Sequence, residues 1–392
     1  MKSQICQTAL TRSAQDFMQV DHLLLHGSNF EIGRQLAKIA IQEHRIHKHP
    51  GDPAKIGAQR RYMQKNFPLH YERMRGAASA LGVDIEKDEV DCSYLNYAPR
   101  LPACSTVYYP PAFTVDGRAL LSRNFDFTTG TFMATPTEPG EMPAAARAYV
   151  IETYPDEGYP SLYIAAFDLL AGCTDGINAA GLMVALNADG ESGQKFPIMP
   201  TFGSAVGVSE IQILRLLLET CATVEEAKEL MLESKHFYMC APCHYLISDR
   251  SGKSFVWEFS PTRNAEFIID GNQRPQVLTN HLLHCYASLD DLPRDDFSAS
   301  TYQRCRTLTG LIENNPPPFT RDQITAFNAA VAITDESYPE PQPVPDRTLW
   351  QTLYDAESLT MNVDFYLGDD ILSTEPLKRK PRRSGFLQFK LG

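Results

Sequence analysis

The chain has 392 residues, of which 43% are hydrophobic, 10% aromatic and 21% charged. These proportions exclude the disordered, collagen-like and coiled-coil classes, and the length fits one or two globular domains. The formal net charge of −12 argues against a surface that follows the phosphates of a nucleic acid. We therefore expect a folded globular protein with no nucleic acid partner.

The sequence has no pattern typical of membrane insertion or export. No apolar run approaches the roughly 20 residues that a membrane helix needs. Residues 1–19 mix polar and apolar side chains, so no signal-peptide core of about 7–15 apolar residues can be drawn there. The nine cysteines are an odd number, which favours free thiols over a disulfide framework. We expect a cytoplasmic protein with no membrane partner and with thiols available for chemistry.

The first hundred residues have a helical pattern. Residues 30–48 place Ile32, Leu36 and Ile39 at helical spacing among polar side chains, which predicts an amphipathic helix. A second helix is predicted over residues 59–81, and Gly82 is its stop signal. Prolines concentrated in residues 96–111 then predict a connection, and we place the main internal boundary there.

Downstream of this boundary, short β-rich runs dominate the sequence, from TVYYPPAF and RALLSRNFDF to EFIID and QVLTN. Two helices are predicted among them, over residues 209–220 and 223–235, the second with a capping box of Thr223 and Glu226. Proline-rich loops precede a last strand-like run over residues 359–366. Strands on both sides of a helix pair predict an α+β fold in which sheets pack together with helices outside.

The first candidate for chemistry is Cys104, which follows a proline-bearing loop and opens a strand run. An isolated cysteine is more often a small buried hydrophobic residue than a nucleophile. About twenty residues later, the sequence R-N-F-D ends the next strand run with Arg123, Asn124 and Asp126. If the two runs are neighbouring strands, these side chains can lower the pKa of the thiol and orient an amine. A surface ion pair in a hairpin is the alternative interpretation.

Cys-Ser-Thr followed by DGRALLSRNFDF resembles the N-terminal nucleophile hydrolases of the cholylglycine hydrolase and isopenicillin-N acyltransferase type, where Cys-(Ser/Thr) precedes Gly-x-x-x-x-x-Arg-Asn-x-Asp. Further elements of the family pattern follow in order: DGINAAGLMVALN to Asn187, HYLISDRSGKSFVWEF through Glu258, VLTN to Asn280, and Thr301 to Arg304. RTLWQTLYDAESLTMNVDFY is similar to the closing strands of that family. The resemblance implies a four-layer αββα sandwich of antiparallel sheets.

In that family the nucleophile is the first residue of the mature chain, because an N-terminal cysteine carries its own base, the α-amino group. Residues 1–103 resemble the helical prosegment of the acyltransferase branch, with FEIGRQLA similar to an early helix. The resemblance implies self-cleavage between Ala103 and Cys104. The products would be a small subunit of residues 1–103 and a catalytic domain of residues 104–392. Ala103 stands where some relatives have glycine, a departure that favours slower cleavage or none.

The resemblance also implies a role for each matching residue. Cys104 attacks the acyl carbon of an amide as a thiolate and forms an acyl-thioester, while its amine moves the proton. Asn187 and Asn280 donate N–H groups to the oxyanion, from the side chain or the backbone. Capping of strand ends is the alternative role for these asparagines.

Three charged residues complete the implied site. Asp126 holds the amine of Cys104 in position. Arg123 lowers the pKa of the thiol and shapes the pocket beside it. Arg304 supports the same cluster, although Arg306 is close enough in sequence to take its place.

Other residues have weaker claims to a role. Cys240 and Cys243, followed by His244, have the C-x-x-C form of a redox or zinc site but lack the second ligand pair of a structural zinc site. His281 and His284 either line the substrate pocket or lie in a polar loop. No cofactor or metal is expected. We interpret the remaining conspicuous acidic residues as turn residues without chemistry: Asp116, Asp175, Asp189 and Asp249.

The sequence therefore predicts a self-processing cysteine amidohydrolase or acyltransferase that acts on a small linear amide. Hydrolysis and transfer share the thioester and differ in the nucleophile that reaches it, so both stay open, as do the acyl group and the self-association of the chain. The competing hypothesis is a non-catalytic binding or assembly protein in which Cys104 stays buried behind an uncleaved prosegment.

Overall fold

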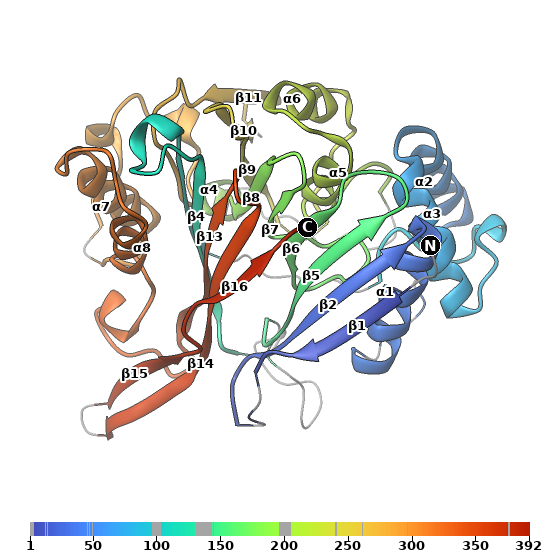
Figure 1. The fold of residues 1–392 in the computed structure, drawn as a ribbon, viewed down its shortest axis with the longest axis horizontal. Coiled ribbons are helices and arrows are strands. Elements are labelled where there is room, and N and C mark those ends of the chain that lie inside the picture. The colour runs from blue at the N-terminus through green and yellow to red at the C-terminus, as the bar shows by residue number, and fades with distance from the viewer. Residues whose placement is uncertain are drawn as a thin grey trace.

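The computed structural model describes residues 4–11, 13, 15–44, 46, 48, 50–95, 103–130, 143, 145–195, 205–239, 241–260, 262–295, 297–374 and 377–392. Within them two large sheets pack face to face, and helices cover both outer faces (Figure 1). The predicted α+β, four-layer αββα architecture is confirmed.

The first sheet has nine strands, and only the pairing of its second and third strands is parallel. In spatial order they are β1 (Gln4–Ala9), β2 (Gln19–Gly27), β5 (Arg147–Pro155), β6 (Ser161–Ala165), β7 (Asp175–Asn178), β8 (Met183–Ala188), β9 (Cys243–Ser248), β10 (Ser254–Ser260) and β11 (Ala265–Asp270).

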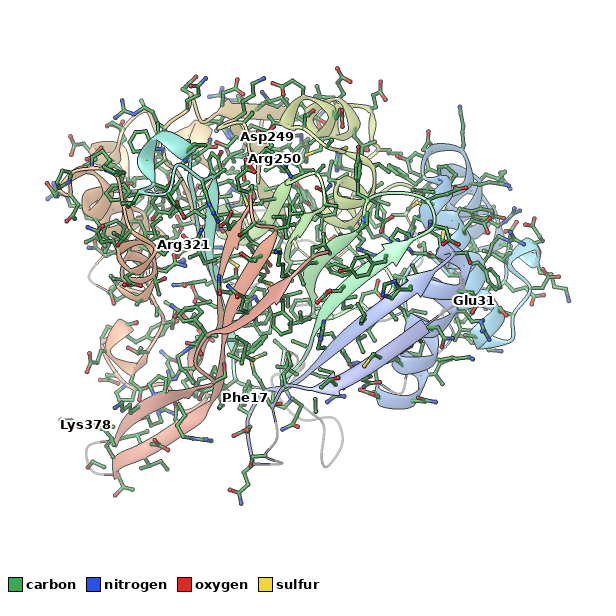
Figure 2. The ribbon with its side chains drawn as sticks, in the orientation of Figure 1. Phe17, Glu31, Asp249, Arg250, Arg321 and Lys378 are labelled. Carbon is green, nitrogen blue, oxygen red and sulfur yellow. The ribbon has the colours of Figure 1, made fainter. Side chains whose placement is uncertain are left out.

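The second sheet is antiparallel throughout. Its order is β12 (Gln276–Leu278), β3 (Ala103–Tyr109), β4 (Leu120–Thr128), β13 (Asp346–Asp355), β14 (Thr360–Thr374) and β15 (Leu377–Arg383), and β16 (Leu387–Lys390) also pairs with β14. The β14–β15 hairpin extends away from the body, with Lys378 near its end (Figures 1 and 2).

The nine-stranded sheet is covered by α1 (Asn29–Glu43), α2 (Pro53–Asn66), α3 (Pro68–Leu81), α5 (Gln212–Thr220) and α6 (Val224–Glu233), and the seven-stranded sheet by α7 (Thr301–Glu313) and α8 (Arg321–Ala329). The short α4 (Gly190–Lys195) follows β8. Short 3₁₀ helices occur at Ile85–Lys87, Pro111–Phe113, Leu283–Cys285, Leu289–Asp291 and Asp335–Ser337. No helix in the described ranges is long and apolar enough to cross a membrane.

Alternation along the strands separates the hydrophobic clusters of the layers. In β3, Tyr108 and Cys104 belong to the cluster between the two sheets, while Val107 and Tyr109 pack with Leu308 of α7 and its neighbours. This is the period-two pattern of a strand buried on both faces. Cys104 therefore faces the interior of the sandwich.

The N-terminal segment is helical only in part. Strands β1 and β2 precede its helices and enter the nine-stranded sheet beside β5. The predicted first helix is present as α1, whose cap Ser28 accepts a hydrogen bond from the Glu31 N–H. The single helix predicted over residues 59–81 is divided, because Pro68 cannot continue a helix and begins a new one. Gly82, in a left-handed conformation, ends α3 as expected.

Two glycines allow α1 and α3 to approach each other closely. A Cβ at Gly33 would lie 2.2 Å from the Arg73 carbonyl oxygen, and one at Gly76 would lie 2.0 Å from the Phe30 oxygen. Both distances are below contact, so larger residues at these positions would force the helices apart.

The helix pair predicted in the middle of the chain is present as α5 and α6, each shorter than expected. Thr223 caps α6 by accepting from the Glu226 N–H, but the Glu226 carboxylate accepts from Ala222 rather than from the cap residue itself. Helices α7 and α8 were not predicted. The Thr301 to Arg304 element forms the first turn of α7.

Candidate active site

The register of β3 and β4 positions the candidate residues. Ala103 pairs with Asp126, and Thr106 pairs with Arg123. Cys104 is the second residue of β3 and has no exposed surface. The two strand runs are therefore neighbours, and the motif residues that are far apart in sequence share one buried region.

Arg123 connects the thiol to the opposite sheet. Its Nη2 donates to Cys104 Sγ at 3.2 Å and to the Leu186 carbonyl at 2.5 Å, while Nη1 donates to Asp175 Oδ1 at 2.5 Å. Asp175 also accepts from Thr352 and Tyr354. A carboxylate with this many donors anchors the guanidinium beside the sulfur.

Our interpretation of Asp175 as a turn residue is wrong. It lies in β7, is fully buried, and holds Arg123. An Asp-Gly pair is typical of turns, which is why the sequence suggested one here. The buried Asp175 carboxylate instead pairs with the Arg123 guanidinium of the opposite sheet. The other three acidic residues lie outside strands and accept backbone or arginine N–H groups, as turn residues do; these are Asp116, Asp189 and Asp249, the last in the β9–β10 turn beside Arg250 (Figure 2).

Side chains form hydrogen bonds with both the N–H and the carbonyl group of Cys104. Its N–H donates to Asn280 Oδ1 at 2.9 Å, and its carbonyl accepts from Arg304 Nη1 at 2.5 Å. Arg304 Nη2 also donates to Asn280 Oδ1, at 2.6 Å. Arg306 instead donates to the carbonyls of residues 289, 292 and 293. The arginine that contacts Cys104 and Asn280 is therefore Arg304 and not Arg306.

Asp126 lies opposite Ala103 in the strand pairing, and within the described residues only one of its two carboxylate oxygens accepts a hydrogen bond. Oδ1 accepts from Thr348 at 2.5 Å. Oδ2 has no hydrogen-bond partner within the described part of the chain and lies 3.7 Å from Arg304 Nη1. Burial raises the pKa of this carboxyl to about 6, against the lowering effect of the Arg304 charge. The free oxygen is suited to receive a cationic N–H group.

The Cys104 thiol is not preactivated in the continuous chain. Burial raises its pKa, while the positive charges of Arg123 and Arg304 lower it and Asp126 raises it. Its nitrogen is an amide of the Ala103–Cys104 bond, so the residue has no base of its own in this state.

Asn187 lies close to the cluster, but its side chain is already engaged. Its Nδ2 donates to the carbonyls of Leu278 and Thr279, both at 3.0 Å, and its Oδ1 accepts from Thr106. In this arrangement the amide fixes the strand end that carries Asn280. A contribution to an oxyanion site would come from its main chain or from a reoriented amide.

A buried glutamate and two histidines support the same strand end. Glu258 accepts from the Nδ1 atoms of His244 at 3.1 Å and His284 at 2.7 Å, and these contacts lower its pKa to about 2 against the effect of burial. The carboxylate raises the pKa of His244, whose Nε2 lies 2.8 Å from the Thr279 oxygen. His244 and His284 therefore act as structural hydrogen-bond donors here.

The two histidines after Asn280 have different environments. His281 Nδ1 contacts the hydroxyls of Thr279 and Thr301, and burial lowers its pKa to about 4. Its ring packs against Tyr302, 5.0 Å between centroids. The described residues contain no group of three or more His, Cys, Asp or Glu side chains that could hold a metal. Cys240 of the C-x-x-C motif lies outside the described residues.

An aromatic wall beside Cys104 was not predicted. Phe125, opposite Cys104 in the register, stacks on Trp350 with ring centroids 3.8 Å apart. Phe127 and Phe167 continue the wall, and Phe167 has a φ of 79°, rare for a non-glycine residue. The sequence signals were the aromatic residues of the R-N-F-D-F run; nothing marked Phe167.

The fold and the motif order define the chain as an N-terminal nucleophile protein of the cysteine hydrolase and acyltransferase class. Residues 114–369 match the family described as acyl-coenzyme A:6-aminopenicillanic acid acyl-transferase, and because the match covers more than half of the sequence, the chain belongs to this family. The matched range includes Arg123, Asp126, Asn187, Asn280 and Arg304, and it begins after Cys104.

Solved structures similar to the chain include penicillin V acylase from Agrobacterium tumefaciens, which is 18% identical with a TM-score of 0.46 over 67% of this chain and 82% of that one. A mutant of conjugated bile acid hydrolase from Clostridium perfringens is 15% identical, with a TM-score of 0.43 over 74% of this chain and 97% of that one. No curated protein sequence matches the chain.

Proposed function

We propose that the protein is a self-processing cysteine amidohydrolase or acyltransferase that opens its own Ala103–Cys104 bond and then cleaves a linear amide of a small acylated substrate. The observation that carries this proposal is the set of contacts around one residue. Separate side chains contact the nitrogen, oxygen and sulfur of Cys104, and the open Asp126 oxygen belongs to the residue paired with Ala103. A cysteine that only packs in a core needs partners for its backbone N–H and C=O groups, but it needs neither a guanidinium at its sulfur nor an open carboxylate oxygen beside its peptide bond.

The self-cleavage step is an N-to-S acyl shift followed by hydrolysis. Cys104 Sγ attacks the Ala103 carbonyl carbon, the C–N bond breaks, and the thiol proton passes to the departing nitrogen. Water then hydrolyses the thioester, which leaves a carboxyl group on Ala103 and a free amine and thiol on Cys104. The Asp126 carboxylate and Asn280 Oδ1 hold the new ammonium group.

The same cysteine then acts on the substrate. Its α-amino group, with an unperturbed pKa near 7.7–8.0, takes the thiol proton and later delivers it to the leaving amine. The acyl group rests on Sγ until water or an acceptor amine removes it. The Asn280 amide, with one N–H donated to Ala188, has a second N–H for the oxyanion. Residues 1–103 stay associated as a small subunit, and the odd cysteine count supports a cytoplasmic setting.

The test is the intact mass of the purified protein beside its Cys104→Ala and Cys221→Ala variants. Cys221 is also buried but lies at the end of α5, away from the site, so it serves as the matched control. We expect fragments 1–103 and 104–392 from the wild type and the control, and one continuous chain from Cys104→Ala. Continuous chains in all three would contradict self-processing.

A second candidate function is a non-catalytic binding protein that keeps the precursor state. The observation that favours it is that the thiol has no exposed surface in the continuous chain. It predicts that Cys104 resists thiol labelling in the native wild type and that no acyl group transfers to it from activated esters. Labelling or acylation of Cys104 in the native protein would exclude it.

A further inference from the structure

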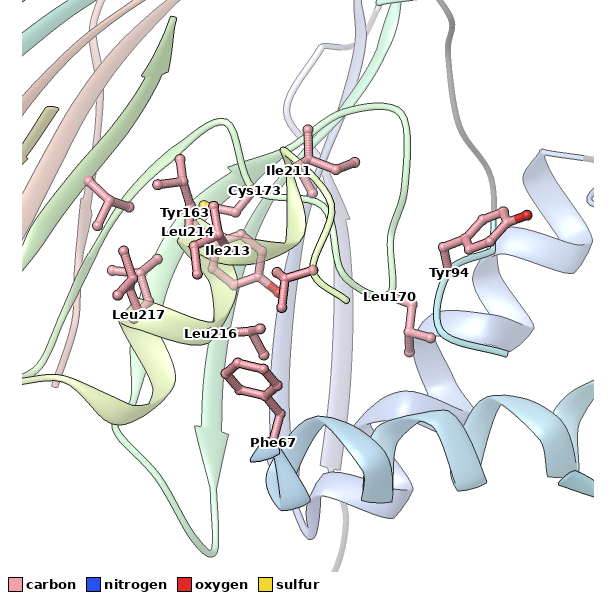
Figure 3. Packing of buried hydrophobic residues seen from close by; sticks show 14 of the residues in the cluster. Phe67, Tyr94, Tyr163, Leu170, Cys173, Ile211, Ile213, Leu214, Leu216 and Leu217 are labelled. Atoms are coloured by element: carbon pink, nitrogen blue, oxygen red, sulfur yellow. The ribbon is translucent and has the colours of Figure 1, made fainter. Parts of the chain in front are cut away.

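Two buried arginines share one carboxylate far from Cys104, between the N-terminal segment and the rest of the fold. Arg73 of α3 donates through Nη1 to Glu219 Oε1 of α5, and Arg215 Nε lies 3.1 Å from the same oxygen. All three side chains are 0–1% exposed. Because both guanidinium groups contact one oxygen atom, they lie side by side. Figure 3 shows part of the hydrophobic cluster to which residues of α3 and α5 contribute, including Phe67, Tyr163 and Leu216.

The charges of this cluster do not balance. Two guanidinium groups face one carboxylate, and burial together with the Arg215 charge lowers the pKa of Arg73 well below its ordinary value. His70 contributes no charge, because burial and the two arginines lower its pKa to about 3. An uncompensated charge in a protein interior is strongly unfavourable.

Other titratable groups near the cluster do not supply the missing charge. Tyr163, whose ring lies 4.0 Å from the Arg215 guanidinium carbon, stays neutral because burial raises its pKa. Cys173 likewise stays a thiol, its pKa raised by burial. The Asp168 carboxylate is engaged by the backbone N–H groups of residues 95, 170 and 171.

Several donors in this cluster have no partner within the described ranges. They are Nε and Nη2 of Arg73 and Nε and Nη2 of Arg215, whose Nε lies near Glu219 but makes no hydrogen bond to it. The hydroxyl of Tyr163 is also without a partner among the described residues. Glu219 Oε2 is also without a partner, but giving it to Arg73 would still leave Arg215 Nη2 and one positive charge. Buried guanidinium N–H groups are normally satisfied, so these donors indicate a ligand.

We propose that a buried monovalent anion of the halide class, chloride under ordinary conditions, binds between Arg73 and Arg215. A water molecule would accept N–H groups but leave the charge uncompensated. A divalent oxyanion would overcompensate it, whereas one halide neutralises the triad. The anion then connects α3, which precedes the Ala103–Cys104 bond in the sequence, to α5, which follows it. This inference is independent of the proposed reaction.

The test compares melting temperatures in chloride, bromide and methanesulfonate salts at equal ionic strength. We expect chloride and bromide to raise the melting temperature of the wild type by about 3 °C over methanesulfonate, by mass action on the folded state. Arg73→Met leaves the neutral Arg215–Glu219 pair and should lose the halide effect. Arg75→Met is the matched control, because Arg75 is on the same helix but exposed and paired with Glu72, and it should keep the effect.

Equal melting temperatures in all three salts for the wild type would overturn the proposal, as would a halide effect that survives in Arg73→Met. If Arg73→Met does not fold, crystals of the wild type in bromide decide the question. An anomalous peak between the Arg73 and Arg215 guanidinium groups supports the anion, and a map without a peak there refutes it.

Discussion

The Asp126 carboxyl should destabilise the precursor, and its replacement by asparagine should relieve that cost. Its pKa is raised from 3.8 to about 6 in the folded chain, so below about pH 4 the carboxyl is protonated in both states. As the pH rises from about 4 to 6, the unfolded state ionises first, and stability falls by about 3 kcal/mol at ~1.4 kcal/mol per unit. Asp126→Asn removes this fall but sets an amide N–H group toward Arg304, which offsets about 1 kcal/mol.

The net gain for Asp126→Asn is therefore about 2 kcal/mol at pH 7, which is about 2–3 °C for a chain of this size. The measurement is the melting temperature from pH 4 to pH 7.5, made in a Cys104→Ala background so that both proteins stay continuous. The difference between them should grow between pH 4 and 6 and stay level above. A difference that is constant with pH, or a less stable asparagine variant at pH 7, would refute the reasoning.

Three further predictions concern the site and its scaffold. Arg304→Lys replaces a planar fork by one amine, so thermal melting should show a loss of about 3 kcal/mol and intact mass should show cleavage slowed at least ~10-fold; unchanged processing would contradict the assigned contacts. Gly76→Ala places a Cβ 2.0 Å from Phe30 O and should lower the melting temperature, whereas Ala at half-buried Gly310, where a Cβ would meet only Asn314 Nδ2 at 3.8 Å, should not. Thr223→Ala removes the α6 cap and should cost about 1 kcal/mol in urea unfolding; a neutral result would show that Asp249, which accepts from the Val224 N–H, caps the helix alone.

The sequence predicted those features that depend on the pattern within a single strand or helix. The R-N-F-D run and the Cys-Ser-Thr run are strands of alternating, buried character, and their pairing follows from the turn between them. The resemblance of the motifs to the family also implied that Asn280 and Arg304 lie near Cys104, although they are far apart in the chain. Their hydrogen bonds to the Cys104 backbone are local consequences of that topology.

The features that sequence reasoning missed depend on contacts between distant elements. Asp175 looks like a turn residue until the opposite sheet brings Arg123 to it. Strand β2 was not predicted. It pairs with β5, more than a hundred residues away in the sequence, and a short amphipathic run does not indicate its partner. Asn187 was expected to donate to the oxyanion from its side chain or its backbone, and the carbonyls of Leu278 and Thr279 occupy its side-chain amide. No local pattern encodes such tertiary hydrogen bonds.

The most direct test of the central claim is chemical labelling of an N-terminal cysteine. A cyanobenzothiazole condenses only with a cysteine that has both a free amine and a free thiol, and unfolding the purified protein before labelling removes any effect of burial. We predict a label on Cys104 at the start of fragment 104–392 in the wild type and no labelled fragment from Cys104→Ala. Wild-type protein without a label on Cys104 would contradict the claim that Cys104 becomes a self-liberated N-terminal nucleophile.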